Sequence, residues 1–304
     1  MNKTGKLHGV IPIMLTPFNA TEEVDVQSLE KHTDFLLTNR VHGVLYGGSS
    51  SESPSLSTEE RKRGLEIVID RVKGKVPVIG CASHTSPKVA IDIATHAEKA
   101  GAAALLISAP YYFKGGFSRV GEEELLGFFG KIAQSVKIPI ILYDNPTATG
   151  VTLEASTIAR LFKEKYVEYL KISLSDPLKV ADVRKLAGDK LTIFCGEEVL
   201  AMQFLERGAA GFTVAAPAVL PGHFVDLYEK FMQGRIDEAW DVFYKILPFI
   251  NVALCEPNYI PCCKEALVML GVISTSTVRN PLIGIDDIRR AQVRRTLKHL
   301  ALVN

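Results

Sequence analysis

A single lysine in the middle of the chain is the strongest candidate for a reactive residue. Lys171 interrupts the otherwise apolar end of the run Tyr166-Val-Glu-Tyr-Leu-Lys-Ile-Ser173. In a strand, alternation places Lys171 on one face and its neighbours Leu170 and Ile172 on the other, and both faces are expected to be buried. Burial disfavours the charged form of an amine, and a neutral lysine is a nucleophile that condenses with carbonyl compounds to a Schiff base. Taken alone, the same pattern also fits a structural lysine that is paired with a carboxylate or reaches into solvent.

Polar residues follow several other apolar runs. They are Gly47-Gly-Ser-Ser-Ser-Glu-Ser53, Ser83-His-Thr85, Pro110-Tyr-Tyr112, Tyr143-Asp-Asn-Pro146, Gly196-Glu-Glu198 and Thr213. If the runs are barrel strands, their C-terminal ends meet at one face, where active sites of such barrels lie. Hydroxyls and one amine with few fixed charges suit a small anionic carbonyl compound.

Three of these groups suggest roles. The glycines before Ser49 and Ser50 allow a backbone nest that would bind a carboxylate, while Ser57 holds a separate helix-capping signal. Tyr143 ends its run in the same phase as Lys171, so its phenol is a candidate proton-transfer group, although a tyrosine at a strand end often only packs. His84 is more typical of an incidental loop residue.

Composition excludes several classes of function. The chain has 304 residues, 47% apolar and 23% charged, with a net charge of +1. This balance gives no basic stripe for nucleic acid, and no apolar run is long enough for a membrane span. The N-terminus lacks a signal-peptide core, so a cytoplasmic location is expected. Five cysteines without C-x-x-C and seven histidines without ligand spacing predict no metal, and no cofactor motif is present.

Short apolar runs alternate with amphipathic stretches along most of the chain. The runs are 10–15, 43–46, 76–82, 103–108, 138–143, 167–172, 191–195 and 211–215. The stretches between them are 26–39, 58–72, 87–100, 122–136, 153–163, 177–187 and 198–207. Eight such units predict an α/β protein, a (β/α)8 TIM barrel. The first run is not followed by G-x-G-x-x-G, the motif that a Rossmann fold would need. We expect a catalytic barrel over residues 1–232 and a helical appendage over 233–304, with helices at 235–251, 262–270 and 285–300.

Several motifs in order resemble the dihydrodipicolinate synthase/N-acetylneuraminate lyase family of Schiff-base enzymes. They are Ile11-Pro-Ile-Met-Leu-Thr-Pro-Phe18, Gly47-Gly-Ser-Ser-Ser-Glu52, Pro110-Tyr-Tyr112, Leu142-Tyr-Asp-Asn-Pro-Thr-Ala-Thr-Gly150, Leu170-Lys-Ile172 and Cys195-Gly-Glu-Glu198. The resemblance implies that Lys171 forms an imine with pyruvate or another 2-keto acid and that Tyr143 is the acid/base. It also implies a carboxylate site at Ser49 and Ser50.

The same resemblance implies two further site residues and an assembly. Tyr112 matches a tyrosine that, in the synthases, completes a proton relay across a subunit interface. Thr213 falls at a position that lines the imine pocket. A homotetramer built from two dimers is the family expectation.

Departures from the synthase pattern bear on the substrate. Ala148 stands where synthases carry an arginine for the carboxylate of the aldehyde substrate, and Ser51 replaces a loop glycine. After Lys171 the chain continues Ile-Ser-Leu-Ser rather than Glu-Ala-Thr. These features favour an aldolase or dehydratase acting on 2-keto-3-deoxy sugar acids. The alternatives are dihydrodipicolinate synthase, which condenses pyruvate with aspartate semialdehyde, and a non-catalytic barrel that binds a keto acid.

Overall fold

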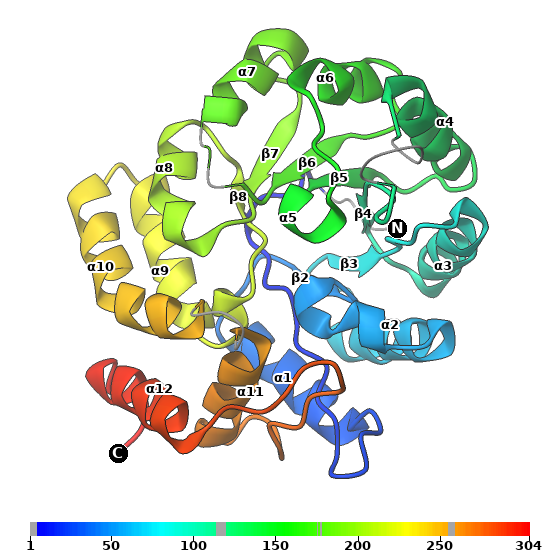
Figure 1. Cartoon of the computed structure of the whole chain (residues 1–304). Coiled ribbons are helices and arrows are strands. Elements are labelled where there is room, and N and C mark those ends of the chain that lie inside the picture. The colour runs from blue at the N-terminus through cyan, green and yellow to red at the C-terminus, as the bar shows by residue number, and fades with distance from the viewer. Residues whose placement is uncertain (1–4, 114–119, 175, 177, 255–258) are drawn as a thin grey trace. The chain divides into compact units, whose positions relative to one another are not determined.

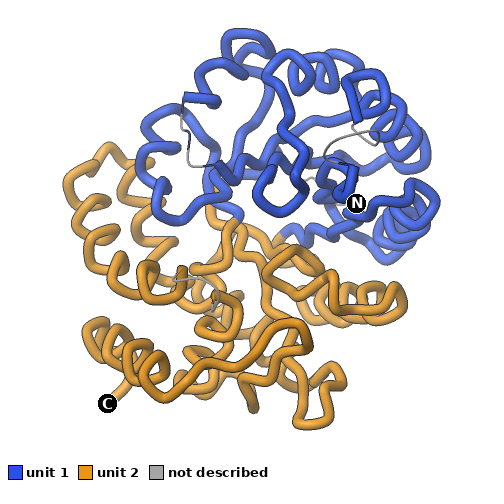
Figure 2. Tube along the Cα trace, viewed as in Figure 1, with its two compact units in different colours: residues 1–8, 77–213 blue, residues 9–76, 214–304 orange. Residues whose placement is uncertain are grey.

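The computed structural model describes residues 5–113, 120–174, 176, 178–254 and 259–304. The chain divides into two compact units (Figure 2). Unit 1 contains residues 1–8 and 77–213, and unit 2 contains residues 9–76 and 214–304. Of the expected elements, Pro177 at the start of one helix lies outside the described residues.

Unit 1 is built on parallel strands that pair in chain order. They are β3 (Val78–Cys81), β4 (Ala104–Ser108), β5 (Ile140–Asp144), β6 (Tyr169–Ile172), β7 (Thr192–Cys195) and β8 (Gly211–Phe212). Apart from Thr192, every residue of these strands is buried. A parallel sheet that is buried on both sides is the arrangement in which helices cover the strands.

Helices separate these strands, and α3, α4, α6 and α7 form the outer layer around them (Figure 1). The helices of unit 1 are α3 (Pro87–Ala100), α4 (Glu122–Ala133), α5 (Pro146–Thr149), α6 (Ala155–Lys163), α7 (Leu178–Ala187) and α8 (Ala201–Glu206). Gly101 ends α3 at a φ of 102°, a conformation that glycine adopts readily. Glycine at this position therefore lets α3 end directly before β4.

Unit 2 holds the remaining strands and the C-terminal helices. Its elements are β1 (Gly9–Val10), α1 (Val26–Thr38), β2 (Val44–Tyr46), α2 (Thr58–Val72), α9 (Pro221–Met232), α10 (Ile236–Ala253), α11 (Tyr259–Met269) and α12 (Asp287–His299). Helices α10, α11 and α12 pack against one another. No helix in the described ranges is both long and apolar enough to cross a membrane.

The strands and helices together make the predicted (β/α)8 barrel with a C-terminal helical appendage. Two expected strands end several residues before their apolar runs do. The first ends at Val10, because Pro12 cannot donate to a ladder and only Ile13 makes a further bridge, to Leu45. The last ends at Phe212, which leaves Thr213 just beyond it.

Two helices, α5 and α9, were not foreseen. Both begin at a proline, a residue well suited to the first turn of a helix. The domain boundary between residues 232 and 233 stays a prediction.

Candidate functional site

Lys171 lies in β6 and is buried, with only 1% of its surface exposed. In the register of the sheet it stands directly beside Tyr143 of β5, as their shared phase predicted. The Lys171 Nζ atom is 3.9 Å from the centroid of the Tyr143 ring. Among the residues that the structure describes, no carboxylate lies within ion-pair distance of this amine. The structure therefore disfavours both simple alternatives, a solvent-exposed lysine and a lysine held in an ion pair.

The hydroxyl of Tyr143 lies in a small polar network. The side-chain amide of Asn145 donates to the phenol oxygen at 2.7 Å, and Ser173 Oγ lies 3.3 Å from the same oxygen. Ser173 in turn donates to the carbonyl of Gly196 at 2.9 Å. Because Asn145 occupies a lone pair of the phenol oxygen, the O–H proton is directed elsewhere and can be exchanged with a ligand. The arrangement fits an acid/base role for Tyr143.

Because Gly196 has no side chain, there is room beside it for the side chain of Lys171. A Cβ atom at this position would lie 2.8 Å from Lys171 Cε, 2.2 Å from Ser173 Oγ and 2.7 Å from the carbonyl oxygen of Ile172. Real Cβ contacts are not this short, and the Ile172 oxygen belongs to the backbone of β6. Any side chain at this point of the turn after β7 would therefore displace the lysine.

Glu197, next in the chain, is a functional candidate to which the sequence pattern assigned no role. The pKa of this carboxyl is raised to about 7: burial and, to a smaller extent, the charge of Glu198 raise it, and the charge of Lys171 lowers it. A carboxyl that titrates near neutral pH close to a buried amine is typical of functional sites. The motif Cys195-Gly-Glu-Glu198 was visible in the sequence. Only the fold shows that the charges of Glu198 and Lys171 act on the carboxyl of Glu197.

Thr213 follows β8 and is 1% exposed. Its backbone N–H donates to the carbonyl of Cys195 at 2.9 Å, which fixes it against the end of β7. Within the described parts of the chain, its hydroxyl oxygen has no hydrogen-bond partner. A buried hydroxyl usually has one, so this group is available to a bound molecule.

Tyr112 and His84 lie outside this cluster of contacts. Tyr112 is 80% exposed, its φ of 85° is in the left-handed region, and its ring stands edge-on to Phe113. A strained, exposed tyrosine is consistent with a residue that acts away from its own subunit. His84 accepts a hydrogen bond from the backbone of Ser86 at 2.9 Å, and its ring stands edge-on to Tyr111. These contacts fit the incidental role that the sequence suggested for His84.

The serine turn, Gly47–Glu52, belongs to unit 2. Gly47 has a φ of 81°, and Ser49–Ser51 form a 3-10 turn in which Ser49 is exposed and Ser50 is buried. The Ser51 hydroxyl donates to the carbonyl of Met14 at 2.5 Å and accepts from the N–H of Gly47 at 3.1 Å. The serine that replaces the family's glycine is thus an anchor of the turn. Because the turn and Lys171 belong to different units, a carboxylate site shared by Ser49, Ser50 and the lysine stays a prediction.

The helix-capping signal after this turn is confirmed. Ser57 accepts from the N–H of Glu60, and the Glu60 side chain accepts from the N–H of Ser57. Ser57 therefore serves α2, which leaves Ser49 and Ser50 for another role.

Ala148 lies exposed in α5, where its N–H bonds to the side-chain oxygen of Asn145 at 3.1 Å. Asn145 therefore connects this position to the Tyr143 hydroxyl through the oxygen and the nitrogen of its side-chain amide. A methyl group at 148 offers no charge to a ligand carboxylate.

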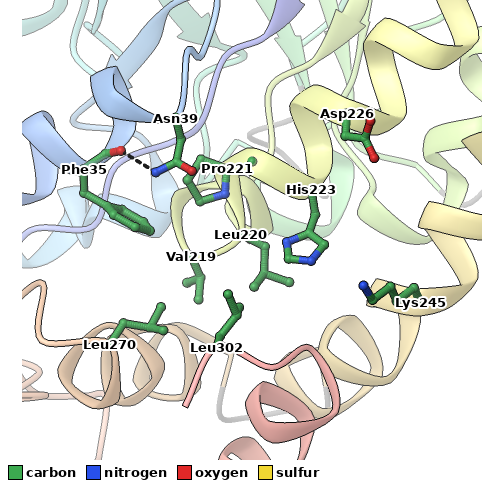
Figure 3. A pocket seen from close by; sticks show the side chains of 11 residues that line it. Phe35, Asn39, Val219, Leu220, Pro221, His223, Asp226, Lys245, Leu270 and Leu302 are labelled. Carbon is green, nitrogen blue, oxygen red and sulfur yellow. Dashed lines mark hydrogen bonds between the residues drawn. The ribbon is translucent and has the colours of Figure 1, made fainter.

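A separate cavity of about 370 Å³ lies in unit 2, between α1, α9, α10 and the C-terminal residues (Figure 3). Its walls are mainly apolar, with His223, Asp226 and Lys245 along one side. It contains none of the predicted site residues. Over the described residues, no group of three or more histidine, cysteine or acidic side chains is placed to hold a metal ion.

A buried lysine against a tyrosine, at the C-terminal side of neighbouring strands in a (β/α)8 barrel, defines a class I enzyme that forms a lysine imine. The model of the dihydrodipicolinate synthetase family matches residues 6–300. The chain belongs to this family.

Similar proteins agree with the assignment along the whole chain. The 4-hydroxy-tetrahydrodipicolinate synthase of Methanocaldococcus jannaschii is 33% identical over 296 residues, which cover 97% of this chain and 99% of that protein. The enzyme of the same name from Methanopyrus kandleri is 34% identical over 300 residues, 98% of each chain. A crystal structure of a dihydrodipicolinate synthase has a TM-score of 0.91 at 33% identity and covers 98% of this chain and 100% of its own. A prophage protein of the same family from E. coli K12, solved in complex with pyruvate, has a TM-score of 0.91 at 26% identity. The match covers 98% of this chain and 100% of that protein's chain.

Proposed function

We propose that the chain uses pyruvate as its first substrate and holds it as an imine on Lys171. The observation that carries the proposal is the buried Lys171 amine, 3.9 Å from the centre of the Tyr143 ring and without a carboxylate partner among the described residues. The family member solved with pyruvate supports the choice of this keto acid.

The residues suggest a simple order of steps. The neutral amine of Lys171 attacks C2 of pyruvate, and the phenol of Tyr143 gives a proton to the developing alkoxide. The phenolate takes a proton back from the attacking nitrogen and gives it to the leaving hydroxyl, so that water departs. The resulting iminium draws electrons from C3, which loses a proton to the Tyr143 phenolate to give an enamine. The enamine carbon then forms a bond to the carbonyl carbon of an aldehyde, or the reverse sequence breaks that bond. Thr213, and Ser49 and Ser50 of the serine turn, would hold the bound keto acid.

For the second substrate, the synthase reaction with aspartate semialdehyde is the first candidate. Four relatives that match nearly the whole chain at 30–34% identity carry the name 4-hydroxy-tetrahydrodipicolinate synthase. These names favour the reaction that the sequence pattern had ranked second.

An aldolase or dehydratase acting on 2-keto-3-deoxy sugar acids is the second candidate, and Ala148 is the observation that favours it. An arginine at this place would bind the aldehyde's carboxylate through two charge-assisted hydrogen bonds, which a methyl group cannot replace. The non-catalytic binding barrel is the weakest alternative, because a protein that only binds a keto acid has no need of a buried amine against a tyrosine.

The first experiment needs pyruvate alone. Formation of the enamine exchanges the methyl protons of pyruvate with solvent, so incubation in D2O should remove the methyl signal from the proton NMR spectrum. The Lys171→Ala variant should show no exchange above the buffer rate. Exchange that persists in this variant, or a chain that never exchanges, would contradict the proposal.

The second substrate is then identified by turnover. Pyruvate with aspartate semialdehyde is compared with cleavage of 2-keto-3-deoxy sugar acids, and pyruvate release is measured with lactate dehydrogenase. Robust condensation with aspartate semialdehyde assigns the synthase reaction, whereas release of pyruvate from a sugar acid assigns the aldolase.

The homotetramer remains a proposal from the family resemblance. The 80% exposure of Tyr112 in the single chain supports an interface there. Light scattering coupled to size exclusion would test it.

A further inference from the structure

The serine turn ends at a residue whose conformation and burial are both unusual. Glu52 has a φ of 57° and a ψ of 33°, which is left-handed backbone at a residue that is not glycine. Its side chain is buried, with 1% of the residue exposed. A buried carboxylate is strongly destabilising unless it is paired, and left-handed backbone at such a residue persists only when its surroundings hold it.

The partners of Glu52 come from the C-terminal region of unit 2. The ammonium of Lys264 in α11, itself fully buried, forms an ion pair with Glu52 Oε1. The same Nζ donates to the carbonyl of Thr277 at 2.7 Å and lies 4.1 Å from the ring centroid of Phe18. The other carboxylate oxygen, Oε2, accepts the backbone N–H of Arg279 at 3.1 Å.

Ser51, the residue directly before Glu52, is held by the N-terminal part of the same unit, and its hydroxyl accepts the N–H of Gly47 at the start of the turn at 3.1 Å. Thr16 donates to the carbonyl of Ser51 at 2.7 Å, and the Ser51 hydroxyl bonds to Met14. Ser49 and Ser50 therefore lie in a turn whose last two residues, Ser51 and Glu52, each have an anchor. One anchor is made by residues that follow β1, and the other is the buried Glu52–Lys264 pair.

We propose that Lys264 is a positioning residue for substrate binding: its pair with Glu52 fixes the left-handed end of the serine turn and so the placement of Ser49 and Ser50. The C-terminal helices then have a part in recognising the substrate carboxylate, although they supply no group that touches it. This inference rests on the proposed function, in which that turn receives the carboxylate of pyruvate.

The test is the Lys264→Met variant, which keeps most of the side-chain length and removes the charge. Its pyruvate dependence is measured by methyl-proton exchange in D2O, which separates the half-saturating concentration from the maximal rate. We expect the half-saturating concentration to rise ~10-fold or more, because small displacements of binding groups weaken binding strongly, with the maximal rate changed ~3-fold or less. Lys230→Met is the matched control, since Lys230 pairs with Asp226 at 2.8 Å on the surface of α9.

A variant that leaves Glu52 unpaired can fail to fold, so a second variant completes the test. Glu52→Gln combined with Lys264→Met removes both charges and keeps an oxygen for the N–H of Arg279. Circular dichroism checks the fold of each variant. A raised half-saturating concentration in either folded variant, with Lys230→Met unchanged, supports the inference.

The inference would be overturned if the half-saturating pyruvate concentration were unchanged in a folded Lys264→Met protein. If that variant does not fold, the same result in the folded double variant would overturn it. It would leave the proposed function intact, because the unchanged chain still exchanges. A wild-type chain that does not exchange protons would overturn the proposed function, and the inference with it.

Discussion

Replacement of Gly196 by alanine should damage the site without removing any polar group from it. The added Cβ would lie 2.7 Å from the carbonyl oxygen of Ile172 and 2.8 Å from Lys171 Cε. The Ser173 hydroxyl, 2.2 Å from the same point, can rotate away, but it then loses its bond to the Gly196 carbonyl. The Ile172 oxygen cannot rotate, so the turn after β7 must move away from β6.

The size of the effect follows from these contacts. Overpacking of a buried site costs about 1–3 kcal/mol of stability, which a chain of this size tolerates. The Lys171 amine must move with its Cε, and a misplacement of ~1 Å in a catalytic group costs ~10²-fold in rate. We therefore expect a folded variant whose pyruvate methyl-proton exchange is slower by about two orders of magnitude.

The assay compares exchange rates at saturating pyruvate with urea unfolding of the same samples. Gly127→Ala is the matched control, because a Cβ at Gly127 in α4 meets no atom within 4 Å. It should exchange at the wild-type rate and gain about 0.5–1 kcal/mol from the better helix propensity of alanine. If Gly196→Ala exchanged protons as fast as Gly127→Ala, the account of how β6 and β7 place the amine would be wrong.

Three further predictions concern single residues. Tyr143→Phe should slow imine formation ~10²–10⁴-fold, the scale of a lost acid/base, and a normal rate measured by stopped flow would remove Tyr143 from the mechanism. Ala148→Arg should raise kcat/KM for aspartate semialdehyde ~10-fold or more if the synthase reaction is the true one, whereas an unchanged value would disfavour that candidate. Glu197, whose folded-state pKa is raised to about 7 from 4.5, contributes stability that is fully present below pH 4.5 and is lost as the pH rises through 7. After allowance for the partial exposure of Glu197, the free energy of unfolding should fall by about 1–2 kcal/mol. Urea unfolding at pH 5 and pH 8 should show this fall in the wild type and not in Glu197→Gln. Equal falls in both proteins would refute the prediction.

The parts of the fold that local patterns determine were predictable from the sequence. Thr58–Val72 and Pro87–Ala100 form helices over the expected residues, because a capping box or an N-terminal proline begins each one and a left-handed residue ends it. The pairing of Lys171 with Tyr143 followed from alternation in two neighbouring strands. These inferences needed no distant contact.

What the sequence could not provide depends on contacts between distant residues. The environment of Glu197 depends on packing around Lys171, which lies 26 residues earlier in the chain. The ion pair between Glu52 and Lys264 joins residues more than 200 positions apart, and neither residue stands out in its own segment. The early end of the first strand was missed because an apolar run does not reveal where ladder hydrogen bonds stop.

The most direct test of the central claim is to trap the imine. The protein is incubated with pyruvate and sodium borohydride, and its peptides are mapped by mass spectrometry. The account predicts a reduced pyruvate adduct on Lys171 and on no other lysine, with loss of proton exchange in proportion to labelling. An adduct on a different lysine, or none at saturating pyruvate, would contradict it.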